Sequence, residues 1–284
     1  MITTKTVRRY YEQNTRMMLR FGSSPRVQTI HRALWPSEVH TLDDALHYAH
    51  QLLLTEIKQL THHTNQATLR IADLGCGIGT SLRYLLTHLQ LPTTAVGITI
   101  SSTQAQMAQA HVGAQHTPAK HTCAVLEADF LHVPLCGGFD AVYSIEAFSH
   151  SPSAERYFAQ AARLLRPGGR LILIDDFLAP TTSPTHEWVT AYQAGWFVPN
   201  VQPVSTIAAL AEAVGLRLAS QRNLTPLLHL RALPNWLALR LLQIGQRWPS
   251  QHAMVPSMLG SMALQQCLRD ELTQYRLLVF ERYG

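Results

Sequence analysis

The 284-residue sequence is poor in charge and in cysteine, and each shortage excludes a class of protein. Charged residues make up 14% of the chain and hydrophobic residues 46%, a balance typical of a folded protein and not of a disordered one. No run of about 18 uncharged apolar residues occurs, so we expect no membrane span. The cysteines lie far apart without a CxxC pair, which predicts no zinc site and a reducing, cytoplasmic location. They are Cys76, Cys123, Cys136 and Cys267.

The chain also lacks the dense basic tract of a nucleic-acid-binding protein. Its formal net charge is +5, from 23 Lys and Arg against 18 Asp and Glu. The arginines are scattered and are not interleaved with aromatic residues, so we expect no nucleic-acid partner. The N-terminal MITTKTVRRYYEQNTRMM is too polar for the apolar core of a secretory signal. Its one local basic cluster comprises Lys5, Arg8, Arg9, Arg16 and Arg20.

What the sequence does contain is a regular alternation of strand and helix patterns. Apolar spacing predicts helices over 4–21 and 41–61. From residue 69 we predict strands over 69–74, 93–98, 123–129, 139–145 and 170–177, separated by helices over 79–89, 101–112 and 153–165. A helix over 204–214, a strand over 216–224, an apolar helix over 233–248 and a strand over 275–282 follow. This order predicts a doubly wound α/β fold with a mostly parallel seven-stranded sheet and an antiparallel edge.

Composition divides the predicted fold into four parts. Residues 1–62 would form an N-terminal helical lid, and residues 63–178 a Rossmann-like core. Residues 179–203, rich in Pro, Thr and aromatic side chains, interrupt the alternation as an inserted cap. Residues 204–284 would complete the core sheet around a helical insertion.

The segment IADLGCGIGTSLRYLL (71–86) places three glycines between a strand and a helix. Gly75, Gly77 and Gly79 would let a ligand approach the backbone, with the N–H groups of the next helix facing it. The dinucleotide fingerprint fails, because Thr80 replaces its third glycine and no acid ends the second strand in GITISS. No Lys-Ser/Thr pair follows, so the loop is not a P-loop. A tight turn packed under a helix would also fit these glycines.

Five motifs at successive strand ends make the interpretation of this glycine loop more specific. They are IADLGCGIGT, GITISSTQ, LEADF, YSIEAFSH and LLRPGGRLIL, in this order. Together they resemble the class I S-adenosylmethionine-dependent methyltransferases, and most closely the small-molecule subgroup that includes tocopherol, cyclopropane-mycolate and sterol or terpene C-methyltransferases. The resemblance implies a Rossmann-like methyltransferase fold with S-adenosyl-L-methionine as cofactor, and we expect no metal.

The resemblance assigns the methionine and ribose of the cofactor to particular residues. The three glycines would let both groups lie against the backbone, and Asp73 would support the amino group through the loop. Many relatives hold the ribose with an acid at the end of the second strand. This sequence departs from them, and Thr99 and Gln104 would hold the ribose instead.

The adenine and the sulfonium are assigned in the same way. Ile100 and Phe130 would pack against the ring, and Asp129 would accept a hydrogen bond from its amino group, as a flat base with one polar edge requires. Ile145 and Glu146 would border the sulfonium. Ile100 and Phe130 also suit ordinary core positions.

Candidate catalytic residues lie at the ends of the fourth and fifth predicted strands, where ligands bind in open parallel sheets. They are Glu146, His150 and Asp176, with Asp175 beside them. A histidine with a pKa near neutrality suits a general base. Because YSIEAFSHSP is similar to a sterol C-methyltransferase segment, Glu146 would stabilise a carbocation and His150 would remove its proton. Local hydrogen bonds or ion pairs would equally explain these polar residues.

Aromatic residues would line the acceptor site, although simple packing of the cap also explains them. The candidates are Tyr10, Tyr11, Tyr143, Phe148, Trp188, Trp196 and Phe197. Arg9, Arg16 or Arg20 would meet an anionic group such as a diphosphate, unless these arginines form a solvated helix face.

The sequence therefore predicts an enzyme that methylates a small, largely apolar specialised metabolite. The leading hypothesis is C-methylation of an isoprenoid or prenylated acceptor through a carbocation. O- or N-methylation of a small natural product is the nearest alternative, and a non-methylating cyclase or binding protein of the same fold is another. No Asn-Pro-Pro-aromatic or Pro-Cys motif favours a nucleic-acid substrate. The acceptor, the methylated atom and the oligomeric state, a homo-oligomer included, stay open.

Overall fold

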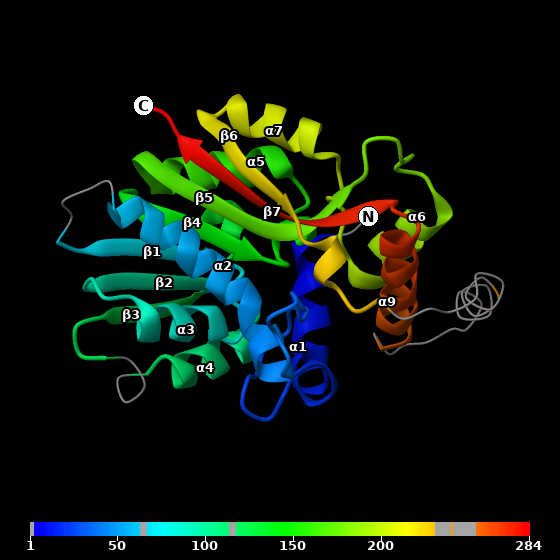
Figure 1. Ribbon diagram of the computed structural model, residues 1–284, viewed down its shortest axis with the longest axis horizontal. Helices are drawn as coiled ribbons and strands as arrows, with labels where there is room; N and C mark the ends of the chain where they lie inside the picture. The colour runs from blue at the N-terminus through cyan, green and yellow to red at the C-terminus, as the bar shows by residue number, and fades with distance from the viewer. Residues whose placement is uncertain (1–2, 63–66, 114–117, 231–239, 241–253) are drawn as a thin grey trace.

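The computed structural model describes residues 3–62, 67–113, 118–230, 240 and 254–284. Its centre is one seven-stranded sheet with the order β3-β2-β1-β4-β5-β7-β6 (Figure 1). The predicted apolar helix over 233–248 falls outside the described residues except for Arg240. No helix in the described ranges has the length and apolar character to cross a membrane.

The predicted doubly wound sheet is confirmed. The parallel strands are β1 (Leu69–Leu74), β2 (Thr93–Thr99), β3 (Thr122–Glu127), β4 (Phe139–Ile145) and β5 (Leu165–Leu178). At the other edge β7 (Thr273–Arg282) runs antiparallel to both β5 and β6 (Leu216–Asn223). The late strands thus form the antiparallel edge that the sequence predicted.

Helices cover both faces of the sheet. They are α1 (Thr4–Gly22), α2 (Leu42–His62), α3 (Thr80–His88), α4 (Ser102–His111), α5 (Ala154–Leu164), α6 (Glu187–Trp196), α7 (Val204–Glu212) and α9 (Met254–Arg269). Alternate residues of β5 enter opposite cores: Ile172 packs in the core that includes α2 and α3, whereas Leu171 packs in the one that includes α5 and α7. This alternation explains why the parallel strands are almost continuously apolar.

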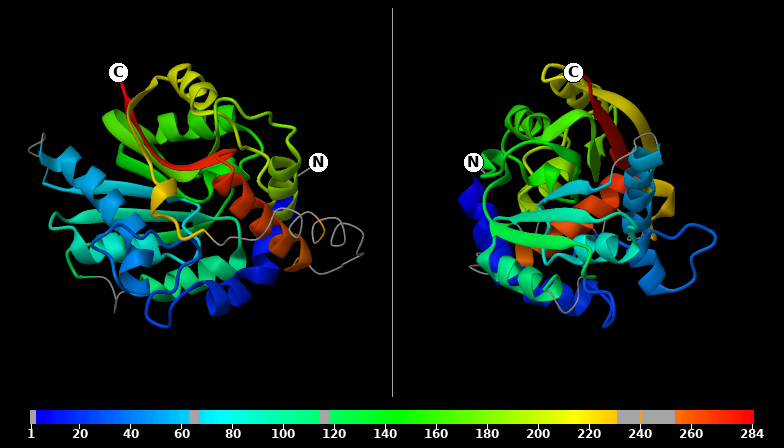
Figure 2. Two further views of the ribbon diagram at one scale, coloured as in Figure 1. Left: turned by 45° about the vertical axis from the view of Figure 1, so that its right-hand side comes forward. Right: turned by 90° about the vertical axis from the view of Figure 1, so that its left-hand side faces the viewer.

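Two features of the fold differ from the sequence prediction. Residues 166–169, which separate the predicted helix over 153–165 from the predicted strand over 170–177, belong to β5, whose pairing with β4 shifts register near its start. Helix α9 was not predicted, because its glycine and proline weaken the helical signal. It crosses α6 closely: a Cβ on Gly195 would lie 2.5 Å from Cα of Gly260. The small residues therefore serve a close helix crossing. Together with α1, these helices cluster at one end of the sheet (Figure 2).

Candidate active site

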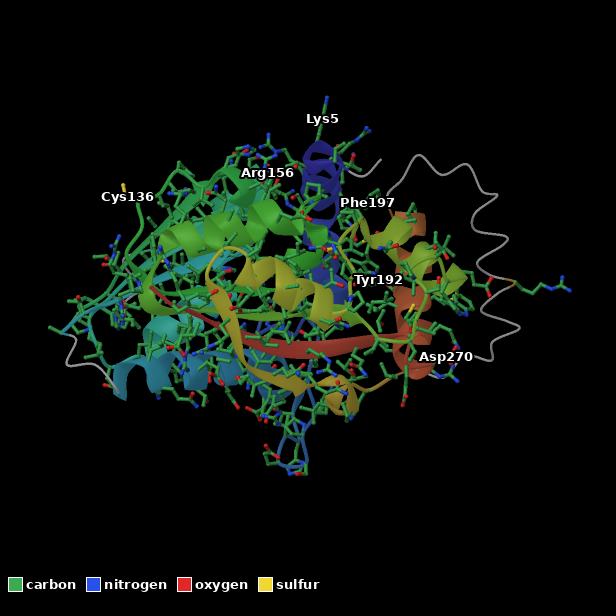
Figure 3. The ribbon with its side chains drawn as sticks, turned by 90° about the horizontal axis from the view of Figure 1, so that it is seen from above. Lys5, Cys136, Arg156, Tyr192, Phe197 and Asp270 are labelled. Atoms are coloured by element: carbon green, nitrogen blue, oxygen red, sulfur yellow. The ribbon has the colours of Figure 1, made fainter. Side chains whose placement is uncertain are left out.

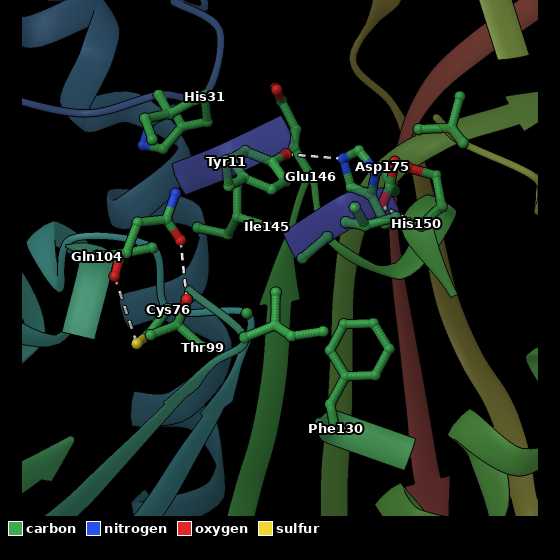
Figure 4. A pocket seen from close by; sticks show the side chains of 18 of the residues that line it. Tyr11, His31, Cys76, Thr99, Gln104, Phe130, Ile145, Glu146, His150 and Asp175 are labelled. Carbon is green, nitrogen blue, oxygen red and sulfur yellow. Dashed lines mark hydrogen bonds between the residues drawn. The ribbon is translucent and has the colours of Figure 1, made fainter. Parts of the chain in front are cut away.

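A pocket lies at the carboxyl ends of the parallel strands (Figure 4). Its lining comes from the loops after β1, β2, β3 and β4, from the end of β5, from α1 and the segment 29–32, and from α6 and α9. Ligands bind at this place in open parallel sheets. In Figure 4, Thr99 and Gln104 lie on one side of the pocket, and His150 and Asp175 on the other.

The three glycines of the first loop have different tasks. All three have positive φ, at 104°, 52° and 81° for Gly75, Gly77 and Gly79. A Cβ at Gly75 would lie 2.3 Å from Cβ of Ala147, and one at Gly79 would lie 3.2 Å from Cβ of Ala108. A Cβ at Gly77 would meet no protein atom within 4 Å. Gly75 and Gly79 thus permit close packing, whereas Gly77 borders open space. Gly75 and Gly77 line the pocket, but Gly79 is not among its lining residues.

The polar residues predicted to hold the ribose lie together. The hydroxyl of Thr99 donates to Oε1 of Gln104 across 2.8 Å, and Nε2 of Gln104 donates to the hydroxyl of Thr15 at 3.1 Å. Both Thr99 and Gln104 are buried in the pocket wall. Thr15 belongs to α1, so the amide of Gln104 also connects the second strand end to the N-terminal helix.

The remaining residues predicted for the cofactor also line the pocket: Ile100, Asp129, Phe130, Ile145 and Asp73. Oδ1 of Asp129 caps the short 3₁₀ helix that follows it by accepting from the Leu131 N–H at 2.9 Å. Asp73 lies beneath the glycine loop and accepts from the Ser81 hydroxyl at 2.9 Å. Burial raises the pKa of Asp73 to about 7. An apolar wall with one carboxylate at its edge fits an adenine nucleoside, although each individual contact stays a prediction.

Arg32 joins two of the predicted catalytic carboxylates. Its Nε and its backbone N–H each donate to Oε1 of Glu146 at 3.0 Å. Its two terminal nitrogens donate to the two oxygens of Asp176 at 3.0 and 2.7 Å. Tyrosine hydroxyls complete the network, with Tyr275 donating to Glu146 at 2.8 Å and Tyr192 donating to Asp176 at 2.9 Å.

The pKa values of the two acids in this network are shifted in opposite directions. Burial alone would raise the pKa of Glu146, but the charge and hydrogen bonds of Arg32 lower it below the ordinary value. Burial raises the pKa of Asp176 despite the same guanidinium. Glu146 also has φ of 50°, the left-handed region that costs a side chain energy and occurs at functional sites.

His150 forms two long-range hydrogen bonds. Nδ1 lies 3.0 Å from the carbonyl of Phe197, and Nε2 lies 2.8 Å from the hydroxyl of Tyr11. A carbonyl only accepts, so Nδ1 carries the proton, and Nε2 accepts from Tyr11 in the neutral ring. Burial lowers the pKa of His150 to about 4. The expectation of a pKa near neutrality is therefore wrong, because desolvation disfavours the imidazolium.

Asp175 lies beside this histidine without a cationic partner among the described residues. Its oxygens accept from the backbone N–H groups of Ser149 at 3.0 Å and Asp176 at 2.8 Å. Burial, with the neighbouring charge of Asp176, raises the pKa of Asp175 to about 7. Glu146, His150, Asp175 and Asp176 line the part of the pocket that we call the acceptor side. This side therefore holds an acid, Asp175, whose charge no nearby described cation offsets.

The structure brings only some of the predicted aromatic residues to the pocket. Tyr11 and Trp196 line it. Phe148 is fully buried against Tyr157 and Phe158 on the opposite core, and Trp188 packs in the core beside α9.

Tyr143, Tyr10 and Phe197 are also absent from the pocket lining. Tyr143 is fully buried in the sheet, and the rings of Tyr10 and Phe197 pack on each other with centroids 5.1 Å apart. The prediction that these residues, with Phe148 and Trp188, line the acceptor site is therefore wrong. Phe197 acts on the site through its backbone carbonyl.

The predicted anion-binding arginines are also placed elsewhere. Arg9, Arg16 and Arg20 are exposed and do not line the pocket, and Lys5 on the same helix points outward (Figure 3). Among the described residues that line the pocket, the cation is Arg32, which the sequence prediction missed. The available signal was indirect: Glu146 and Asp176 end neighbouring strands, and buried carboxylates require a cation.

Comparisons with known proteins agree with this geometry. Residues 72–173 match the family described as Methyltransferase domain. The chain is 30% identical over 183 residues to 24-methylenesterol C-methyltransferase 2 of Oryza sativa subsp. japonica, covering 62% of this chain and 48% of that protein. It is 37% identical over 106 residues to the chloroplastic tocopherol O-methyltransferase of Arabidopsis thaliana, covering 37% and 29%. The chain thus spans about half or less of the length of these relatives.

Solved structures match over almost the whole chain. A geranyl diphosphate C-methyltransferase from Streptomyces coelicolor A3(2), crystallised with S-adenosyl-L-homocysteine, has a TM-score of 0.68 at 20% identity and covers 98% of this chain and 97% of that one. A cyclopropane synthase from Mycobacterium tuberculosis has a TM-score of 0.68 at 20% identity, with 98% of each chain covered. At this identity the structures establish a shared fold.

Proposed function

We propose a function from the premise that this chain carries a class I S-adenosylmethionine-dependent methyltransferase domain, as its sequence predicted. Its cofactor is S-adenosylmethionine, in line with the methyltransferase family match and with neighbouring structures crystallised with S-adenosyl-L-homocysteine or SAM; it supplies an activated methyl group when bound. The proposed activity is transfer of this methyl group to a carbon of a small, largely apolar isoprenoid or prenylated acceptor. The sterol relative, named as a C-methyltransferase, supports carbon as the methylated atom.

The observation that carries the proposal is the state of His150. Its Nε2 carries no proton, lies in the pocket lining and accepts a hydrogen bond from the Tyr11 hydroxyl at 2.8 Å, and burial lowers the pKa of the ring to about 4. Such a weak base is poorly matched to a hydroxyl group, whose proton is held tightly. It suffices for a carbon-bound proton next to a carbocation, which is very acidic. A carbocation formed by methylation of an alkene therefore fits this histidine better than an oxygen acceptor does.

The other residues of the acceptor side have roles that follow from their contacts. Arg32 holds Glu146 and Asp176 in fixed positions through hydrogen bonds of 2.7 to 3.0 Å. Asp175 would stabilise the positive charge that develops on the acceptor, since fixed charges act strongly where water is excluded. His150 would take the proton at Nε2 once the hydroxyl of Tyr11 has moved aside, while the Phe197 carbonyl keeps its hydrogen bond to Nδ1–H.

A labelled methyl donor tests this function directly. The protein is incubated with S-adenosylmethionine labelled in the methyl group and a panel of isoprenoid alcohols, prenylated indoles and prenylated phenols. We expect label in a product whose new methyl carbon is bonded to carbon, as read by NMR. Label bonded to oxygen or nitrogen would favour the alternative small-molecule methyltransferase. Tight cofactor binding without label transfer would favour a non-methylating member of the fold.

A further inference from the structure

We propose that the acceptor is uncharged where it enters the pocket and becomes cationic on methyl transfer, and that acceptors bearing a diphosphate are rejected. This inference rests on the proposed function and narrows its substrate class. It starts from the charges of the pocket lining. The described lining residues include five carboxyl groups and a single guanidinium, that of Arg32. The carboxyl groups are those of Asp73, Asp129, Glu146, Asp175 and Asp176.

Arg32 is not available to a phosphate. Three of its side-chain N–H groups point at Glu146 and Asp176, and its guanidinium carbon lies 3.9 Å above the centre of the Tyr275 ring. One positive charge therefore stands between two carboxylates, and the group of three keeps a net negative charge. A diphosphate that recruited Arg32 would leave the buried Asp176 and the part-buried Glu146 without their cation and next to new negative charge, which is strongly unfavourable.

The two histidines of the lining do not supply the missing positive charge. Nδ1 of His31 donates to the carbonyl of Arg32 at 3.1 Å, and its Nε2 lies 2.8 Å from Nε2 of His50. Both ring nitrogens are thus engaged within the protein, as are those of His150. Burial lowers the pKa of all three histidines, so they are neutral at physiological pH.

No other described basic residue reaches the pocket. The basic residues of α1 are exposed and absent from its lining, and Arg8 faces Glu127 at 3.7 Å. A bridging cation would need a chelating group, but among the described residues no cluster of three or more His, Cys, Asp and Glu is arranged to hold one. Among the described residues, the walls therefore offer a diphosphate neither a guanidinium free of carboxylate partners nor a built metal site.

The same walls suit a neutral acceptor that turns positive. Asp175 is 1% exposed and accepts from two backbone N–H groups, and no described cationic side chain pairs with its carboxylate. The hydroxyl of Tyr11 and the apolar side chains Trp196, Val198 and Leu264 complete the surroundings. A neutral alkene has no charge that would lose its water on entering such a site. The cation formed by methylation then lies close to negative groups that are already in place.

Binding and turnover of matched ligands test the inference. Geraniol and geranyl diphosphate are titrated into the protein saturated with S-adenosyl-L-homocysteine, with and without Mg²⁺, and both are offered with labelled S-adenosylmethionine. We expect geraniol to bind at least about tenfold more tightly, with or without Mg²⁺. Tighter binding or preferred methylation of the diphosphate would overturn the inference and leave the methyltransferase function intact. Failure of every acceptor to take up label, with the cofactor bound, would overturn the proposed function.

A cationic probe tests the other part of the proposal, that the acceptor becomes cationic on methyl transfer. Geranyldimethylammonium places a positive charge close to where the carbocation would form. Asp175→Asn should weaken its binding by about tenfold and leave the binding of geraniol nearly unchanged. Glu38→Gln, at an exposed position, changes the net charge equally and should alter neither. An equal effect of both variants on the probe would show that only overall charge matters, and would overturn the role of Asp175.

Discussion

The hydroxyl of Tyr11 donates to Nε2 of His150 across 2.8 Å and so joins α1 to the loop that follows β4. Nδ1 of the same ring is occupied by the carbonyl of Phe197. The nitrogen that would take a proton from the acceptor is therefore the one that Tyr11 covers. The contact that joins α1 to the pocket is therefore the same contact that covers the base.

Substituting these two residues tests the relationship. His150→Ala should lower kcat by about 100-fold or more, the usual loss for a general base, with cofactor affinity nearly unchanged. Tyr11→Phe should have a smaller effect, and the double variant should be no slower than His150→Ala, because the two residues act as a pair. Single-turnover rates and calorimetry with S-adenosyl-L-homocysteine measure both quantities. Tyr283→Phe, which removes an exposed hydroxyl that bonds Glu212, is the control. A wild-type rate for His150→Ala would remove it as the base.

Gly77 offers a clean test of the cofactor site. Its added side chain would meet no protein atom within 4 Å, so Gly77→Leu should fill the ligand space without a clash. We expect cofactor binding to be lost and the protein to stay folded. The positive φ costs about 1–2 kcal/mol for any side chain.

Gly215 provides the matched control for Gly77. It has φ of 80°, borders β6, and a Cβ there would come no closer than 3.7 Å to another residue. Gly215→Leu carries the same kind of backbone strain away from the pocket, and calorimetry should find its cofactor affinity unchanged. Unaltered affinity in Gly77→Leu would mean that the loop is only a packed turn.

How much of this site the sequence predicts depends on how far apart the interacting residues lie along the chain. Strands β1 and β4 have the predicted bounds, because short apolar runs ended by glycine or polar residues carry local information. The residues predicted for the cofactor, Gly79 excepted, line one pocket, since they lie at or after the ends of neighbouring strands; their individual roles stay predictions. Arg32 was missed because its partners lie 114 and 144 positions away, and no local pattern encodes such a pairing. The pKa of His150 was misjudged for a related reason, because burial by α1 and α6 is a tertiary property.

Removing the missed arginine should destabilise the protein strongly. Arg32→Met leaves the buried Asp176 and the part-buried Glu146 without a cation; breaking a buried pair costs about 3–5 kcal/mol, and the partial exposure of Glu146 places the expected loss at the lower end. Denaturant unfolding should report this loss in the free energy of unfolding, and Glu146→Gln with Asp176→Asn should restore part of it. Arg26→Met, at an exposed position, should change stability by less than about 0.5 kcal/mol. Similar losses in both arginine variants would contradict the network described here.

Asp175 predicts how turnover depends on pH. Its pKa of about 7 means that the acid gains its negative charge as the pH rises through neutrality. A cation on the acceptor is stabilised only by the charged form, so kcat should rise with an inflection near pH 7. His150 adds no inflection in this range, because its pKa is about 4. Asp73 also has a pKa of about 7 but lies at the cofactor side of the pocket. Measuring kcat at saturating S-adenosylmethionine removes any effect of Asp73 on cofactor binding from the pH profile. Asp175→Asn should flatten the profile and lower its upper limit.

The same acid gives an independent prediction for stability. Its pKa in the folded protein, about 7, lies above the ordinary value of 3.8 for an aspartate. The folded state therefore binds more protons between these values, and the cost of burying Asp175 is greatest above pH 7 and falls as the pH is lowered. The free energy of unfolding of Asp175→Asn relative to wild type should thus be higher at pH 8 than at pH 5.5, by about 2 kcal/mol. Because this measurement requires no acceptor, a constant difference across that range would show that Asp175 does not titrate there, whatever the substrate is.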